Sequence, residues 1–183
     1  ALGQRIKHWN NLNTDTEKWD FDNQGRLITQ VAFGGDVTTH SYSWNAAIAA
    51  SGTGLSGTGG WTQVTTMANG QRAIETSDIF GRAPQNTDLG NHVTSYNYDV
   101  AGRLLSAAIG ISSSNYQYFN TGLSSRASTT TPAYAGWNTV LGWYYYTTST
   151  VQAADYTYSA TGKRLTEYGT TIKSGTTTVW KNQ

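Results

Sequence analysis

A nine-residue pattern recurs along the chain and constrains its fold more than any other feature. The pattern has aromatic residues at positions 1 and 3, Asp or a similar residue at position 4, Gly at position 7, and Arg then Leu at positions 8 and 9. Clear copies span residues 19–27 and 96–104, and a third at 156–165 has one extra residue before its Leu. A fixed period of about 20 residues predicts a repeat architecture with one supersecondary element per period. The glycines that keep this period are Gly81, Gly102, Gly122, Gly142 and Gly162, of which Gly142 lacks the aromatic pair.

Each copy of the pattern is predicted to form a β-hairpin. Residues two apart on a strand point to the same face, so the two aromatic residues of a copy are expected to pack side by side as a structural spine. The Asp-x-x-Gly that follows predicts a type I turn, because Asp accepts hydrogen bonds from backbone amides two residues on and Gly adopts positive φ at the turn's end. The predicted spine is Trp19, Phe21, Tyr96, Tyr98, Tyr116, Tyr118, Tyr156 and Tyr158. The predicted turn glycines are Gly25, Gly81, Gly102, Gly122 and Gly162.

The composition favours strands over helices. Aromatic residues make up 13% of the chain, which argues against a disordered polar chain and favours pleated strands. Glu occurs only at positions 17, 75 and 167, whereas long helices use Glu, Lys, Leu and Ala heavily. We therefore expect an all-β fold of repeated antiparallel hairpins that form a curved strip.

Charge and cysteine content exclude several classes of function. Only 13% of residues are charged and the formal net charge is +1, which argues against a nucleic-acid binder that neutralises many phosphates. The absence of cysteine excludes a disulfide scaffold, a Cys-ligated zinc site and a thiol nucleophile. No apolar run approaches the roughly 18 residues of a membrane helix. No basic-then-apolar signal peptide opens these residues, so export is not encoded in them.

Residues 46–60 interrupt the period. They are rich in Gly and Ala and predict a flexible insertion loop between strands, with a short helical turn at 46–50 as an open alternative. The start, 1–6, looks like the second half of a hairpin unit, and no capping element closes the array at residue 183. We expect residues 1–183 to be a hairpin array truncated at both ends.

The copy at 96–104 resembles the YD repeat of Rhs proteins, and the resemblance spans essentially the whole chain. This family includes bacterial Rhs toxins, the B and C components of insecticidal toxin complexes, wall-associated toxin proteins and animal teneurins. The resemblance implies a hairpin strip that spirals into part of a hollow shell, which in the bacterial toxins encloses a toxic polypeptide. It also implies a secreted or cell-surface location, with the remainder of a larger chain and its toxin cargo as partners.

The chain departs from the full family pattern in two ways. The Asp-Pro-x-Gly-Leu type motif that supports self-cleavage is absent, since the only prolines are Pro84 and Pro132, and no variable toxin domain follows. Neither autoproteolysis nor a toxic activity is therefore carried over. The expected function is a non-catalytic structural segment of a shell that encapsulates a toxic polypeptide.

No catalytic or metal-binding constellation stands out. Asp20 and Asp22 face one way on a strand, but a turn residue and a strand-surface residue explain them better than a glycosidase pair does. His8, His40 and His92 lack the spacing of a metal site. No Ser lies in Gly-x-Ser-x-Gly. We expect no enzyme, no metal and no cofactor.

Two other functions remain open. Exposed aromatic rings stack on sugars, and interleaved arginines (Arg26, Arg103, Arg164) add cation–π contacts, so an extracellular carbohydrate-binding or adhesive repeat is one alternative. The irregular cluster with Trp143 and Tyr145 is the candidate glycan-stacking site in that case. The other alternative is a self-assembling fibre subunit, because exposed strand edges invite self-association.

Overall fold

A computed structural model describes residues 4, 6–9, 16–55, 57–140, 143–173 and 176–182, and within these it describes the side chains of 4, 6–9, 16–55, 57–132, 139–140 and 151–170. The chain divides into two units, Ala1–Val93 and Thr94–Gln183. The described residues form strands, turns and loops and contain no helix. The all-β class and the repeated antiparallel hairpins expected from the sequence are confirmed.

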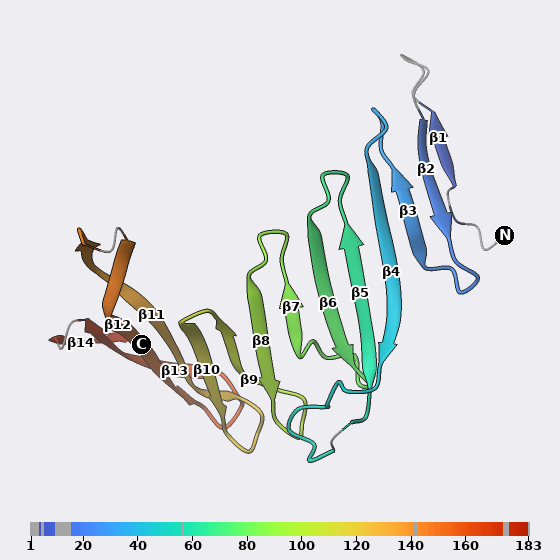
Figure 1. The fold of residues 1–183 in the computed structure, drawn as a ribbon. Coiled ribbons are helices and arrows are strands. Elements are labelled where there is room, and N and C mark those ends of the chain that lie inside the picture. The colour runs from blue at the N-terminus through green and yellow to red at the C-terminus, as the bar shows by residue number, and fades with distance from the viewer. Residues whose placement is uncertain are drawn as a thin grey trace. The chain divides into compact units, whose positions relative to one another are not determined.

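In the first unit, each strand pairs antiparallel with the next along the chain (Figure 1). This is the simplest antiparallel topology, in which every connection is a hairpin. The strands are β1 (Lys7–Trp9), β2 (Thr16–Phe21), β3 (Leu27–Val31), β4 (Val37–Asn45), β5 (Gly60–Thr66), β6 (Arg72–Asp78) and β7 (Gln85–Thr87).

The second unit repeats this meander with longer strands. Again each strand pairs antiparallel with its successor. The strands are β8 (Val93–Tyr98), β9 (Leu104–Ile109), β10 (Ser112–Tyr118), β11 (Ser124–Asn138), β12 (Trp143–Tyr158), β13 (Arg164–Lys173) and β14 (Thr176–Asn182).

Successive connections alternate between the two ends of the strands, because neighbouring strands run in opposite directions. Within each unit, the turns that carry the sequence motif therefore lie at one end of the strands, which we call the motif end. In the first unit it holds turns 22–26 and 78–82 and the loop 46–59 (Figure 1). In the second unit it holds turns 99–103, 119–123 and 159–163. The repeat period of about 20 residues is thus two strands and their two connections.

Burial is shallow throughout the described residues. No large side chain there is fully buried, and the buried hydrophobic residues are Ile48, Ala50 and Ala153. The described residues place no helix and no second sheet over the strands of either unit. No helix among them is long and apolar enough to cross a membrane.

The loop 46–59 packs against its own unit. Residues 46 and 47 form a turn rather than a helical segment. The Gly59 backbone N–H donates to the Ile48 carbonyl oxygen across 2.9 Å, and Ala50 exposes only 2% of its surface. Gly60 lies so close to Ile48 and to the Ser77 carbonyl that no side chain fits there. The Gly/Ala-rich insertion expected from the sequence is therefore anchored at both ends.

Candidate functional site: the turn clasps and tyrosine latches

Among the described residues, eight five-residue turns share one backbone geometry. In each, the N–H of the first residue donates to the carbonyl of the fifth, and the N–H of the fourth donates back to the carbonyl of the first, at 2.8–3.1 Å. This pairing is a type I turn closed by a residue with positive φ, as Asp-x-x-Gly predicts. The turns are 22–26, 32–36, 67–71, 78–82, 88–92, 99–103, 119–123 and 159–163.

The fourth position requires positive φ. The five predicted turn glycines have φ between 77° and 88°, and Asn91, with φ of 63°, takes this position in turn 88–92. Four hairpins of the motif end also show a register shift at the second aromatic residue of the spine, which is the bulge that follows from a left-handed turn residue. These shifts occur at Phe21, Tyr98, Tyr118 and Tyr158.

Three of the turns carry an Asp–Arg pair that we call the turn clasp: Asp22 with Arg26, Asp78 with Arg82, and Asp99 with Arg103. In turn 99–103, Asp99 Oδ1 accepts from the backbone N–H groups of Ala101 and Arg103 at 2.9 and 2.8 Å. Its Oδ2 accepts from Arg103 Nε at 2.6 Å. One carboxylate thus holds two turn amides and the side chain that leaves the turn.

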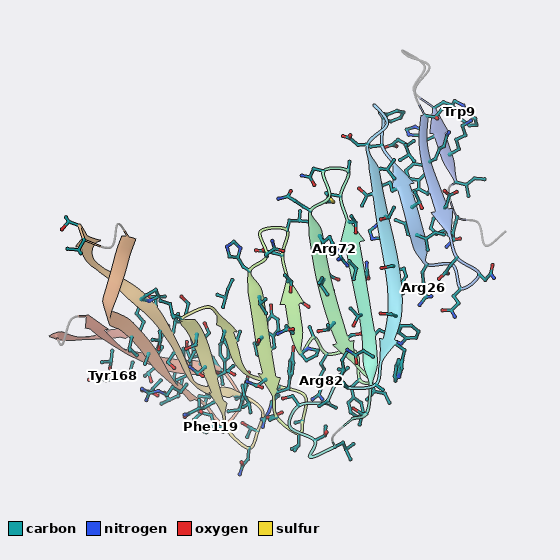
Figure 2. The ribbon with its side chains drawn as sticks, in the orientation of Figure 1. Trp9, Arg26, Arg72, Arg82, Phe119 and Tyr168 are labelled. Carbon is teal, nitrogen blue, oxygen red and sulfur yellow. The ribbon has the colours of Figure 1, made fainter. Side chains whose placement is uncertain are left out.

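The other two clasps have nearly the same dimensions. Asp22 accepts two backbone N–H groups at 2.9 Å and Arg26 Nε at 2.7 Å. Asp78 accepts two at 2.9 Å and Arg82 Nε at 2.8 Å. Asp78 is the only buried polar or charged residue among those that the structure describes, with 4% of its surface exposed. Arg26 and Arg82 are labelled in Figure 2.

The clasps stabilise the ionised carboxylates. The Arg26 backbone N–H, its guanidinium and the Gln24 N–H outweigh partial burial and hold the pKa of Asp22 below its usual 3.8. Burial raises the pKa of Asp99, but the hydrogen bonds from Arg103 and Ala101 together outweigh it, and the net pKa is again below 3.8. Hydrogen bonds to the charged form are the physical cause in both turns.

The arginine of a clasp then contacts the next hairpin. Arg26 Cζ lies 4.5 Å from the centre of the Tyr42 ring, and the Tyr42 hydroxyl donates to the Leu27 carbonyl oxygen at 3.0 Å. We call this arrangement of Arg, Tyr and backbone carbonyl the tyrosine latch. It joins β3 to β4 through side chains, in addition to their backbone pairing.

The second unit contains the same latch. Arg103 Cζ lies 4.7 Å from the Tyr118 ring centre, and the Tyr118 hydroxyl donates to the Leu104 carbonyl oxygen at 2.8 Å. Arg103 Nη1 also donates to the Phe119 carbonyl oxygen at 3.3 Å, which links turn 99–103 to the next motif turn. A cation–π contact at such a partly exposed position contributes about 0.5–1 kcal/mol.

Two turns of the motif end lack the clasp. Turn 119–123 has Phe119 and Leu123 in place of Asp and Arg, and the Phe119 ring meets the Tyr158 ring edge-on at 6.2 Å. Turn 159–163 has Ser159, whose Oγ accepts one backbone N–H, that of Lys163 at 3.1 Å, and shares a hydrogen bond with the Thr161 hydroxyl at 2.9 Å. The extra residue moves the arginine one place on, to Arg164, whose Cζ lies 5.6 Å from the Tyr156 ring.

The spine residues predicted from the sequence are all half-buried, and the residue between the two members of each pair is exposed. Each pair therefore shares one face, as the two-residue strand period requires. The side chains of Trp143 and Tyr145 and the whole of Gly142 lie outside the described residues. The predicted glycan-stacking pair therefore has no structural account.

The histidines and the Asp20–Asp22 pair form no common site. His8 lies 3.2 Å from Glu17, His40 3.0 Å from the Thr65 hydroxyl, and His92 3.0 Å from Asp88 within its own turn. Asp22 belongs to a clasp and Asp20 is exposed on β2. In the part of the chain that the structure describes, no three His, Asp or Glu side chains are placed to share a metal ion.

Sequence reasoning missed the tyrosine latch and three of the turns. Turns 32–36, 67–71 and 88–92 lie at the other end of the strands, and only Asp88 supplies a carboxylate at their first position. The sequence signal for these turns is half the repeat period. Turns 22–26 and 32–36 start ten residues apart, and so do turns 78–82 and 88–92.

Comparison with known proteins finds likeness in structure but not in sequence. No family model and no curated protein matches the sequence. A Photorhabdus luminescens Tc holotoxin pore carrying a TccC3 mutation matches over 91% of this chain, with 14% identity and a TM-score of 0.44. A complex of TcdB2, TccC3 and Cdc42 also matches over 91%, with 14% identity and a TM-score of 0.43.

The matched structures contain the Tc toxin components TccC3 and TcdB2. This chain is similar to them in fold. It spans only 9% and 10% of the length of the chains that it matches.

Proposed function

We propose that this chain is a non-catalytic wall segment of a larger, exported YD-repeat shell, and that the shell sequesters a polypeptide cargo. The observation that carries the proposal is the tyrosine latch, which occurs with the same partners in both units, at Tyr42 and at Tyr118. A wall requires that neighbouring hairpins stay attached to one another. The latch adds side-chain contacts to the backbone hydrogen bonds between the two strands that it joins.

The exposed surface supports the same proposal. The chain exposes 12113 Å², whereas a globular chain of 19.9 kDa exposes about 8,700 Å² by the usual scaling of surface with mass. A segment with this much surface and no large buried side chain in its described part depends on hairpin contacts more than on a core. That balance suits a thin wall with one face toward a cargo and the other toward solvent.

The mechanism of such a wall is physical. Paired strands satisfy their backbone groups along the sheet, and the clasps hold the hairpin ends in one conformation. A closed sheet of this kind keeps an enclosed polypeptide away from proteases and from the producing cell. Similarity to Tc toxin components motivates the exported location.

The test uses the protein in its native source. Peptides of this sequence are expected in a species far above 19.9 kDa when intact mass is measured with protease inhibitors present. Limited proteolysis of that species is expected to spare one internal polypeptide until denaturant opens the shell. A native species near 19.9 kDa would overturn the proposal, as would a large species with no protected segment.

A further inference from the structure

The first unit presents a row of polar and aromatic side chains across four neighbouring strands. Tyr42 on β4 lies opposite Gln63 on β5, Gln63 lies opposite Glu75 on β6, and Glu75 lies opposite Asn86 on β7. Residues directly opposite one another on antiparallel strands share a face. The four side chains therefore stand next to each other on one face of this unit.

A hollow of about 260 Å³ opens over this row. Trp61 belongs to the same face, because it lies two residues before Gln63 on β5. The volume is close to the lower end of ordinary ligand pockets, roughly 300–1,000 Å³, so it suits a small group rather than a long chain. The residues that line the hollow include Tyr42, Trp61, Gln63, Glu75, Ser77 and Asn86.

The lining combines one aromatic surface with several hydrogen-bonding groups. Trp61 remains 42% exposed even though the Trp44 ring meets it edge-on at 5.5 Å. The Glu75 side chain is exposed and makes no hydrogen bond or ion pair to a described residue. Asn86 Oδ1 is buried and accepts no hydrogen bond from a described residue, so it has unused acceptor capacity. Gln63 adds an amide that both donates and accepts.

The charges around the hollow restrict the ligand. Arg26 Cζ lies 4.5 Å from the Tyr42 ring centre and 5.2 Å from the Trp61 ring centre, so a positive charge already lies near both aromatic rings. A second cation over these rings would be repelled. The Glu75 carboxylate disfavours an anionic ligand in the same way. A neutral ligand rich in hydroxyl groups avoids both penalties.

We infer that the hollow at Trp61 and Glu75 binds one neutral sugar unit. A pyranose has an apolar face that packs on an indole ring and hydroxyls that donate to a carboxylate and exchange hydrogen bonds with an amide. This site goes beyond the wall function, which needs no such hollow. It is also separate from the Trp143 and Tyr145 cluster that the sequence favoured.

Titration of the full chain with methyl glycosides of glucose, galactose and mannose tests this inference. Binding is followed by nitrogen-15 NMR of the indole N–H groups, with choline and glucuronate as charged probes. The wild-type protein is expected to bind at least one of the three glycosides saturably, with a shift of the Trp61 indole signal. Neither charged probe is expected to bind as tightly.

Variants locate the binding. Trp61→Ala and Glu75→Ala are each expected to weaken binding about tenfold, the equivalent of one aromatic or carboxylate contact. Trp61→Phe, which keeps a ring, is expected to retain part of the affinity. Trp9→Ala is the matched control, because Trp9 is 62% exposed in the same unit but lies outside the hollow.

Three results would overturn the inference: no saturable binding of any glycoside to the wild type, choline or glucuronate binding as tightly as the glycoside, or equal losses in Trp9→Ala and Trp61→Ala. Circular dichroism of each variant separates loss of the site from loss of the fold. Because this test uses the chain itself, its failure leaves the native-mass test of the wall function unaffected.

Discussion

The Tyr118 hydroxyl donates a hydrogen bond to the backbone carbonyl oxygen of Leu104, 2.8 Å away on the preceding strand. Leu104 directly follows the clasp arginine Arg103, whose guanidinium lies against the Tyr118 ring. One tyrosine therefore contacts both the backbone of Leu104 and the side chain of Arg103, the two residues that lead out of the preceding turn. The tightness of the turn and the attachment of the next hairpin are coupled through these two residues.

Removing the hydroxyl of the latch should weaken this attachment. Tyr118→Phe keeps the ring against Arg103 but leaves the Leu104 carbonyl without this donor, and we expect a loss of about 1 kcal/mol in the free energy of unfolding. Urea denaturation followed by circular dichroism measures it. Tyr116→Phe is the control, since the Tyr116 hydroxyl bonds to no described residue. Equal losses in the two variants would show that the latch hydrogen bond adds nothing.

Acid should loosen the clasps. The pKa of Asp22 and of Asp99 is lower in the folded chain than the usual 3.8, so the folded state binds these protons more weakly than the unfolded state does. Their stabilisation is complete above 3.8 and is lost as the pH falls through the lowered values. Urea midpoints measured from neutral pH down to strongly acidic pH should therefore decrease.

Substitution assigns part of this acid effect. Asp99→Asn removes one titrating carboxylate from a clasp, and we expect a lower midpoint at neutral pH and a smaller decrease on acidification. Asp20→Asn, on the exposed surface of β2 and outside the clasps, is the matched control. A profile for Asp99→Asn that runs parallel to the wild type at all pH values would contradict the role of the clasp.

The turn position of Gly122 tests the demand for positive φ without steric interference. Its φ is 88°, and no atom lies within 4 Å of an added Cβ. Gly122→Ala should therefore cost about 1 kcal/mol through backbone conformation alone. Gly122→Asn should cost less, because Asn91 adopts positive φ at the same position of turn 88–92. Thermal unfolding that ranks Asn below Ala would count against this explanation.

Gly60 is required for a different reason. An added Cβ would overlap the Ser77 carbonyl oxygen and lie 2.9 Å from Ile48 Cγ2, so the pairing of β5 with β6 would have to shift. Gly60→Ala is expected to cost about 1–3 kcal/mol by overpacking. Hydrogen exchange should show faster exchange of the β5 and β6 amides. Unchanged exchange there would mean that the loop 46–59 absorbs the methyl group.

The local parts of the fold could be predicted from the sequence because their determinants lie within five residues. Asp99 and Gly102 specify a turn by side-chain capping and by positive φ, and neither effect depends on distant contacts. The bulge at Tyr98 follows from the same turn. The antiparallel direction of successive strands follows from these short turns. The all-β class follows from the alternation of half-buried and exposed residues along each strand.

The latches and the hollow could not be predicted, because they depend on register between hairpins. Arg26 and Tyr42 are 16 residues apart, and their contact requires the pairing of β3 with β4. The sequence suggested Arg26 and Arg103 as cation–π partners for a ligand, whereas the structure places both on the chain's own tyrosines. Turns such as 67–71 were missed because Met67 cannot cap its own turn as Asp does.

Within each unit, the return of the described motif turns to the same end of the strands has a consequence for how such chains change length. Deleting or duplicating one strand would reverse the direction of everything after it and move the later clasps to the opposite end. Deleting or duplicating two strands preserves both the direction of the later strands and the face of the sheet to which their side chains point. Insertion or deletion of a whole hairpin, two strands at a time, therefore leaves the neighbouring latches intact. A loop such as 46–59 can lengthen within one hairpin without changing the direction of the strands that follow.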